Sequence, residues 1–354
     1  MNGHRPLTSR PVRATLLSRI SIRSRLSLLA GLIAVLFVIW ITPTPKNLYT
    51  PQDNSVVDAH ELAIQNSIVI PAYNEAPNMD PLVRRVFDSL TPLQKQQTEI
   101  LIIDDNSPDT TSLEISKLRE EGYNVHLHVR EVEKGLSSAV LHGFSLAAGD
   151  KLLVMDADLQ HPPESVQSLL EALDETHLFA LGTRYGKGVE MDKDWPVYRR
   201  IISWGARLLS RPLTAAQDPM GGFFALNKKL FLSSQPLNPS GFKIGLELLL
   251  KTPLQPSQLT HVPYGFAKRQ VGSSKLGLKV IFKYIGQLLA LYQWRFGAKF
   301  YLFLATFVAL GVWTVLRVGE EVVKRFGWEE TVLGGLLAGA GAEKGRRKKD
   351  KWIV

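Results

Sequence analysis

The 354-residue chain contains no cysteine, which excludes disulfides, zinc–thiolate sites and a cysteine nucleophile. Three glycine signatures are absent as well. The sequence has no G-x-x-x-x-G-K-[ST] phosphate loop, no G-x-G-x-x-G after its first predicted strand, and no G-x-S-x-G. These absences argue against a P-loop enzyme, a dinucleotide-binding fold and a serine hydrolase. No N-x-[ST] glycosylation acceptor occurs either, which weakly favours a cytosolic location for the folded body.

The body of the chain has no net positive charge, although the net charge of the whole chain is +9. Residues 1–25 carry six arginines and no acid, and residues 343–354 carry six basic and two acidic residues. The two ends therefore contribute +6 and +4, and everything between them carries −1. Nucleic-acid binding needs a basic face on the domain itself, so we expect no nucleic-acid partner. Basic segments that flank apolar runs are typical of membrane-proximal sequence.

Two long uncharged apolar runs lie near the ends, at residues 26–45 and 300–316. Both approach the ~20 residues that cross a hydrocarbon core. The second run is predicted to be a membrane anchor rather than a buried core helix. The first is long for a signal peptide, and no A-x-A-like cleavage site follows it.

Between these runs, strand-like and helix-like segments alternate. This pattern predicts an α/β domain with a largely parallel sheet that is covered on both faces. The expected organisation is a basic tail at 1–25, an apolar transmembrane or interfacial segment at 26–45, a linker at 46–65, a catalytic domain at 66–275, an amphipathic interfacial helix at 276–298, a transmembrane helix at 299–317 and a tail at 318–354.

Polar side chains follow four of the predicted strands. Ligands of open α/β sheets bind beyond the carboxyl ends of the strands, so these residues are expected to share one edge. They are Tyr73, Asn74 and Glu75; Asp104, Asp105, Asn106 and Ser107; Asp156, Ala157 and Asp158; and Thr183, Arg184 and Tyr185.

The stretch VMDADLQHPPE carries the sharpest chemical signal. Residues two apart on a strand point to the same face, so Asp156 and Asp158 are expected to share one face, and Gln160 joins them if the extended path continues. Two adjacent carboxylates repel unless a proton or a cation lies between them. Ligands that are all oxygens suit Mg²⁺ or Mn²⁺. We interpret His161 as a supporting or surface residue rather than as a ligand.

Other polar residues carry weaker signals. Glu75 is assigned to the site in preference to a helix-start carboxylate. One of Asp104 and Asp105 is expected to accept hydrogen bonds from a base or a ribose, the alternative being that both only form a turn. His126 and His128 are interpreted as structural, because they share one strand face without a third partner.

Nine motifs in order resemble the dolichol-phosphate mannosyltransferases of the fungal type, which carry their own C-terminal anchor. The motifs are SIVIPAYNE, IIDDNSPD, EKGLSSAVLHGF, VMDADLQHPPE, LGTRYGKGV, DKDWPVYRR, RPLTAAQDPMGGFF, GFKIGLELLLK and FAKRQVGSSKLGLKVI. The resemblance covers residues 66 to about 316 and leaves residues 1–65 outside it. It implies a GT-A glycosyltransferase fold and inverting transfer of mannose from GDP-mannose to dolichyl phosphate, for protein glycosylation and GPI-anchor assembly.

The resemblance also implies roles for single residues. Those that would hold the guanosine are Pro71, Tyr73, Glu75, Ile103 and Asp105. Those that would hold the metal and the diphosphate are Asp156, Ala157, Asp158 and Gln160. Arg184 matches the family's G-T-R-Y arginine, and Arg269 with Lys275 match its R-x-x-G-x-S-K, where both motifs contact phosphates. Asp218 falls in the acceptor loop, where animal-type members have an arginine in place of Phe224, so no phosphate contact is assigned to that position.

The chemistry of the substrates fits this implication. A phosphate monoester is already ionised near neutral pH, because its second pKa is about 6, so it needs no strong general base. Its attack on a sugar diphosphate brings two anions together. Arg184, Arg269 and Lys275 can pair the acceptor phosphate, and a metal at Asp156, Asp158 and Gln160 can neutralise the leaving group. The alternative is that Arg269 and Lys275 are ordinary charged residues of the surface.

The ends of the chain pose a topological conflict. Residues 276–298 fit either a helix packed on the domain or a basic interfacial helix. The resemblance implies an endoplasmic reticulum membrane protein with a cytosolic catalytic domain, in contact with membrane lipid, for which partner subunits are not required. Six arginines before the first apolar run would keep the N-terminus cytosolic. If that run spanned the membrane, the catalytic domain would then be lumenal. That run therefore lies in the interface, spans against the charge rule, or is not part of the expressed chain.

Two rival functions remain. One is a polyprenyl-phosphate glucosyltransferase that uses UDP-glucose and has an N-terminal span like residues 26–45. The other is a non-catalytic membrane subunit that keeps the fold as a scaffold and tolerates loss of the acidic residues.

Overall fold

The computed structural model of the protein describes residues 22–42, 47–55, 63–186, 197–239, 243–267 and 278–326. Its internal contacts divide the chain into two units. The sheet unit is Pro43–Arg295, and the helix-pair unit is Met1–Thr42 together with Phe296–Val354. The basic residues 343–354 and most of residues 1–25 lie outside the described ranges.

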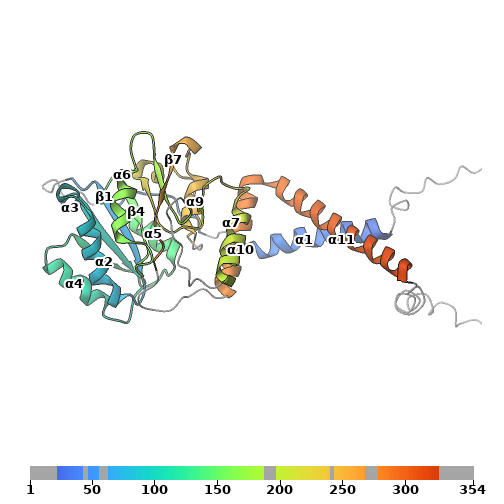
Figure 1. Ribbon diagram of the computed structural model, residues 1–354, viewed down its shortest axis with the longest axis horizontal. Helices are drawn as coiled ribbons and strands as arrows, with labels where there is room; N and C mark the ends of the chain where they lie inside the picture. Colours follow the sequence, from blue (N-terminus) through green and yellow to red (C-terminus); the bar gives the residue numbers. More distant parts are fainter. Residues whose placement is uncertain are drawn as a thin grey trace, which may run out of the picture. The chain divides into compact units, whose positions relative to one another are not determined.

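The sheet unit is built on seven strands among the described residues, in the order β3-β2-β1-β4-β6-β5-β7 (Figure 1). The strands are β1 Asn66–Ala72, β2 Thr98–Asp104, β3 Val125–Val129, β4 Lys151–Val154, β5 Phe179–Thr183, β6 Phe224–Asn227 and β7 Leu259–Pro263. Every neighbouring pair is parallel except the two that involve β6, which runs antiparallel to both β4 and β5. The predicted largely parallel α/β sheet is confirmed.

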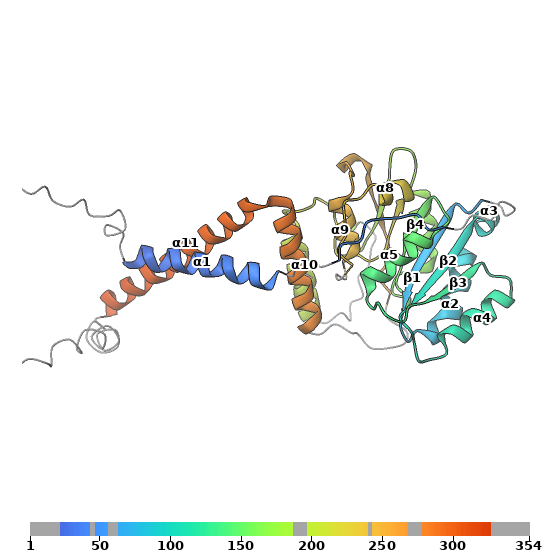
Figure 2. The same ribbon diagram turned by 180° about the vertical axis from the view of Figure 1, so that it is seen from behind.

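Helices cover both faces of this sheet (Figures 1 and 2). Those of the sheet unit are α2 Ala76–Ser89, α3 Pro92–Gln96, α4 Thr111–Glu120, α5 Leu136–Leu146, α6 Val166–Glu171, α7 Val197–Ser210, α8 Lys228–Leu232, α9 Ile244–Lys251 and α10 Leu278–Phe296. Short 3₁₀ turns occupy Pro163–Ser165 and Pro256–Gln258.

The strand sequences explain the two cores. In β1, Ile68 and Ile70 point into one core with α2, α4 and α6, while Val69 points into the other with α5, α8 and α9. Side chains alternate along a strand, so a continuous apolar run places a buried residue on each face in turn. All three of these side chains are completely buried.

Residues 47–55 of the predicted linker contact the sheet unit. Tyr49 forms a backbone bridge with Leu237, and Lys228 Nζ lies 2.8 Å from Asp53 Oδ1. These contacts hold the chain against the sheet unit before β1 begins.

The helix-pair unit consists of α1 Ile22–Ile41 and α11 Ala298–Phe326. Within α11, Ala298–Val322 is long and apolar enough to cross a membrane, and none of its most apolar stretch is buried. The membrane helix predicted at 299–317 falls inside this element.

Candidate active site

The carboxyl ends of β1, β2, β4 and β5 lie at the same edge of the sheet, because these strands run in one direction. Each of the turns that follow β1, β2 and β4 contains a residue with positive φ: Asn74 at 57°, Asn106 at 58° and Leu159 at 61°. A left-handed leucine is strained, and such strain concentrates at functional sites. The edge that carries the predicted polar clusters is therefore also the edge with this unusual backbone.

The acidic turn after β4 differs from its predicted geometry. β4 ends at Val154, and residues 155–160 turn instead of continuing as a strand. The extended path does not continue to Gln160, because Ala157 and Asp158 form a turn and Leu159 has a positive φ. The Asp156 side chain is 39% exposed, whereas Asp158 is 5% exposed and accepts a hydrogen bond from the Gln160 backbone N–H at 3.1 Å.

His161 is hydrogen-bonded to the backbone of the acidic turn. Its ring is buried, stacks on Phe223 with the ring centroids 4.9 Å apart, and accepts the Asp156 backbone N–H at Nδ1 over 3.0 Å. Burial lowers the pKa of His161, although Asp156 and Asp158 act against it. The neutral ring can accept that N–H. His161 is therefore a buried supporting residue, and the surface alternative was wrong.

Space beside the acidic turn is kept open by Gly222. A Cβ atom at this position would lie 3.7 Å and 3.8 Å from the two carboxylate oxygens of Asp156, so any longer side chain would fill the space in front of them. The available donors are carboxylate and amide oxygens, which suit Mg²⁺ or Mn²⁺. Among the described residues no group of three or more His, Asp or Glu side chains forms a ready-made metal site.

Arg184 and Asp218 form a buried ion pair. Arg184 Nε lies 2.7 Å from Asp218 Oδ2, and Nη2 lies 2.9 Å from Oδ1. Burial alone would raise the pKa of Asp218, but the hydrogen bonds and charge of Arg184 outweigh it and hold that pKa below its usual value. The sequence placed both residues at the site but did not pair them. The pair uses Nε and Nη2, and the guanidinium also lies 5.4 Å from the centroid of the Phe266 ring.

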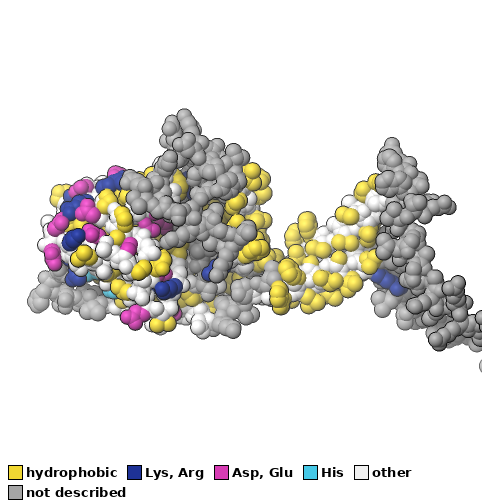
Figure 3. Space-filling view, turned by 90° about the horizontal axis from the view of Figure 1, so that it is seen from below, with side chains coloured by type: hydrophobic (Ala, Val, Ile, Leu, Met, Phe, Trp, Pro, Cys, Tyr) yellow, Lys and Arg dark blue, Asp and Glu magenta, His cyan; other side chains and the backbone are white. Residues whose placement is uncertain are grey.

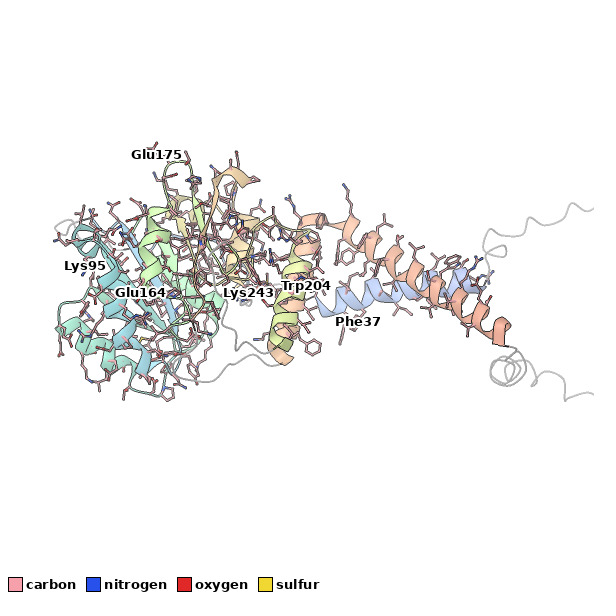
Figure 4. All side chains as sticks on the ribbon, viewed as in Figure 1. Phe37, Lys95, Glu164, Glu175, Trp204 and Lys243 are labelled. Atoms are coloured by element: carbon pink, nitrogen blue, oxygen red, sulfur yellow. The ribbon has the colours of Figure 1, made fainter. Side chains whose placement is uncertain are left out.

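Replacing Asp218 by asparagine is expected to lower the free energy of unfolding by about 3 kcal/mol, because it leaves a buried guanidinium without its counter-charge. Denaturant unfolding measures the change. Arg85 and Glu164 provide the matched control. Their ion pair is also bidentate, with Nε 2.8 Å from Oε1 and Nη2 3.0 Å from Oε2, but the Glu164 side chain is 57% exposed (Figure 4). Glu164→Gln should lower stability by less than about 1 kcal/mol. Equal losses in the two variants would contradict a structural role for the buried pair.

Lys243 belongs to the site although the sequence analysis did not single it out. It directly precedes α9 (Figure 4). With Asp156, Gly221 and Gly222 it lines a small cavity in the sheet unit. Its Nζ donates to the Met220 carbonyl at 2.8 Å. Burial and the nearby charge of Arg184 together lower the pKa of Lys243 to about 8, against the opposing effect of Asp156 and Asp218. The available signal was its position in the motif GFKIGLELLLK.

At the end of β2 the neighbouring residues Asp104 and Asp105 have different partners. Asp104 is buried and caps its own turn by accepting from Ser107 N at 2.8 Å. Asp105 instead faces Arg130, whose Nε donates to Asp105 Oδ1 at 2.9 Å, and it accepts Gly135 N at 2.7 Å. Arg130 follows β3, so the rule that polar residues at strand ends form the site would have found it.

The remaining predicted nucleotide residues differ in their access to a ligand. Tyr73 is 40% exposed, and Lys134 Nζ lies 5.7 Å from the centroid of its ring. Glu75 accepts from Asn78 Nδ2 at 2.7 Å at the start of α2, and Pro71 is partly exposed. Ile103 is completely buried, in its backbone as well as in its side chain. Arg269 and Lys275 lie outside the described residues.

Comparison with known proteins places this geometry in a family. Residues 67–233 match the model of glycosyl transferase family 2. The dolichol-phosphate mannosyltransferase of Mycosarcoma maydis is 50% identical over 255 residues, which cover 70% of this chain and 87% of that protein. The Saccharomyces cerevisiae dolichol-phosphate mannosyltransferase is 48% identical over 260 residues, covering 72% of this chain and 95% of that protein. A solved glucosyl-3-phosphoglycerate synthase from Mycobacterium tuberculosis, in complex with Mn²⁺ and UDP, is 19% identical, covers 69% of this chain and 88% of its own, and has a TM-score of 0.47.

The sheet order and the acidic turn at its carboxyl edge are those of a family 2 glycosyltransferase with the GT-A fold. Within that class, the chain belongs to the dolichol-phosphate mannosyltransferases, as the resemblance of its motifs implied.

Proposed function

We propose that the chain transfers mannose from GDP-mannose to dolichyl phosphate with inversion, and that the reaction takes place at the carboxyl edge of the sheet. The observation that carries this proposal is the acidic turn of residues 156–160, set beside the cations Lys243 and Arg184 in a chain about half identical to dolichol-phosphate mannosyltransferases. An oxygen of the acceptor phosphate attacks C1 of mannose, the bond from C1 to the diphosphate breaks, and GDP leaves.

The proposed chemistry needs positioning and charge compensation more than proton transfer. The acceptor phosphate is already anionic, so the site must lower the repulsion between it and the diphosphate. We assign this task to Arg184, held rigidly by Asp218, and to Lys243 beneath Asp156. Arg269 and Lys275 are proposed to add positive charge from the acceptor side. Fixed cations act strongly here because the site is partly buried.

Asp156, Asp158 and Gln160 are proposed to hold Mg²⁺ or Mn²⁺, with Ala157 contributing its backbone next to the diphosphate. Gly222 leaves room for such an ion in front of Asp156. A divalent ion bound there would neutralise the charge of the departing diphosphate. Asp158 keeps the turn in shape through its bond to Gln160 N.

Removing divalent ions with EDTA is expected to stop mannose transfer and to weaken GDP binding at least about tenfold, because the diphosphate then meets two bare carboxylates. Calorimetric titration with GDP measures binding independently of turnover, and added Mg²⁺ or Mn²⁺ should restore both properties. Tight GDP binding that EDTA leaves unchanged would argue against a metal at this turn.

The guanosine is proposed to lie against Pro71, Tyr73, Glu75 and Asp105, with the backbone of Ile103 behind it. Arg130 fixes the orientation of Asp105 and thereby one acceptor for the base or ribose. The decisive test is an assay of purified protein with each sugar nucleotide and polyprenyl phosphate. Transfer from UDP-glucose but not from GDP-mannose would establish the rival glucosyltransferase and overturn this proposal.

We also propose that the sheet unit meets the membrane interface through α7 and α10. Tyr284 and Tyr292 of α10 donate to the carbonyls of Ala206 and Leu209 on α7, at 3.0 and 2.6 Å. Together the two helices expose apolar side chains, namely Ile201, Ile202, Trp204, Leu208, Leu209, Phe282 and Ile285. Leu288 of α10 is buried, whereas Phe282 is 71% exposed, so this helix both packs on the domain and presents apolar side chains to the outside. An endoplasmic reticulum location with a cytosolic sheet unit completes the proposal.

Trp204→Asp is expected to raise the KM for dolichyl phosphate in vesicles about tenfold and to leave the KM for GDP-mannose unchanged, because the side chain is 63% exposed on α7 (Figure 4). Steady-state kinetics with each substrate varied in turn measures the effect. Leu93→Asp, at a position 61% exposed on α3, is the matched control and should change neither constant. A parallel change in both variants would argue against a membrane-facing role for α7.

A further inference from the structure

The first helix is buried along a single line. Ser27, Gly31, Val38 and, just beyond the helix, Thr42 are the buried positions of the segment for which the structure describes side-chain exposure. Their spacings of four, seven and four residues place them on one face of α1. That face lies against α11, which runs antiparallel to α1 (Figures 1 and 2). The sequence places α1 outside the family resemblance, so its partner was unknown from the sequence.

Glycine makes the contact between the two helices possible. A Cβ atom on Gly31 would lie 2.6 Å from the backbone oxygen of Ala305 and 3.4 Å from its Cα, so the two backbones touch at this point. Small residues at such a crossing are typical of helix pairs in membranes, where van der Waals contact between backbones drives association. A helix that merely lay on the surface of the bilayer would have no need of this contact.

The faces of the pair that point away from the contact are apolar. On α1 the exposed side chains include Leu29, Leu32, Ile33, Leu36, Phe37 and Trp40, and on α11 they include Leu302, Phe303, Phe307 and Leu310. Phe37 projects from α1 on the side away from α11 (Figure 4). On the face seen in Figure 3 the described part of the pair is covered by hydrophobic side chains, and basic ones appear toward the end where the undescribed tails begin. Such an extended apolar surface is typical of a segment that contacts a membrane.

The dimensions fit a bilayer. The apolar part of α1, Ser24–Trp40, rises about 25 Å, which is at the short end of the lengths that cross a hydrocarbon core. The 29 residues of α11 exceed that thickness, and its most apolar part, Ala298–Val322, covers it. No charged residue occurs in residues 26–42 or in residues 300–316.

We propose that α1 and α11 cross the bilayer together as an antiparallel two-helix hairpin. The chain enters the sheet unit after Thr42 and leaves it at Phe296. Both residues then lie at the same end of the hairpin, where α1 ends and α11 begins. Residues 1–21 and 327–354 emerge together on the opposite face of the membrane. In this orientation both basic tails lie on the side of the membrane opposite to the sheet unit, contrary to the positive-inside rule. The contact with α11 fixes the orientation. The proposal concerns the anchor and does not depend on the reaction proposed above.

The topology can be read from cysteine labelling, because the chain has no cysteine of its own. Single cysteines are introduced at Ser9, at Asp350 and, in the sheet unit, at the exposed Ser112 of α4, and sealed microsomes are treated with a membrane-impermeant maleimide. We expect Ser9→Cys and Asp350→Cys to share one accessibility, and Ser112→Cys to have the opposite one. Labelling of Ser9→Cys on the same side as Ser112→Cys would overturn the hairpin and place α1 on the membrane surface.

The packing is tested with two glycine variants. A protease site is inserted at residues 43–46, the chain is cut, and the retention of the α1 fragment with the remainder is measured during purification in mild detergent. Gly31→Leu should release the fragment, because the new side chain meets the Ala305 backbone. Gly311→Leu, where a Cβ atom meets nothing within 4 Å, should retain it like the parent chain. Release from the parent chain, or equal retention by the two variants, would refute the helix contact.

Discussion

Asp158→Ala is expected to abolish mannose transfer, with a loss of at least about 10³-fold in kcat, while the protein keeps its fold. Asp158 is 5% exposed, and its carboxylate both accepts Gln160 N and supplies one of two charges in the acidic turn. Its loss removes half of the charge proposed to hold the metal and loosens the backbone that presents Asp156. Transfer assays together with circular dichroism and thermal unfolding separate loss of chemistry from loss of structure.

Asp150→Ala provides the control for this variant. Asp150 immediately precedes β4 and is exposed, so it lies at the end of the strand opposite to the acidic turn. Its removal should change kcat by less than about twofold, as expected for a surface position. A fully active Asp158→Ala protein would refute the role assigned to this carboxylate in binding the metal and the diphosphate.

Lys243→Met is expected to lower kcat/KM by about 10²-fold with little change in stability, because it removes a fixed positive charge next to Asp156. The exposed Lys229 of α8 is the matched control, and Lys229→Met should be as active as the parent protein. A charge-independent packing role for Lys243 would predict full activity in the methionine variant.

The same lysine predicts a pH dependence. Burial lowers the pKa of Lys243 to about 8, so the charged form dominates below that pH and is lost as the pH rises through it. We expect kcat/KM, which reports the free enzyme, to fall on the alkaline side with a midpoint near that value. Lys243→Arg keeps its charge at alkaline pH, and its profile should stay flat through this range. An alkaline fall that persists unchanged in Lys243→Arg would assign the titration to another group.

The edge of the sheet that forms the site was predictable because it depends on strand direction alone. Continuous apolar runs such as residues 100–103 predict buried parallel strands, and residues of parallel strands end at one edge. The acidic turn, Arg184 and the Asp104–Asp105 doublet could therefore be placed from the sequence. The path of the turn itself could not, because strand parity assumes an extended chain and Leu159 adopts a positive φ.

What the sequence determined by itself was the order of strands and helices, the apolar ends and the residue types gathered at the carboxyl edge, since these follow from local periodicity and composition. Only the tertiary structure decided the partners. Arg184 and Asp218 are 34 residues apart, Lys243 and Asp156 line the same cavity, and Gly31 touches Ala305. Such contacts depend on how distant segments pack, and no local rule of spacing contains that information.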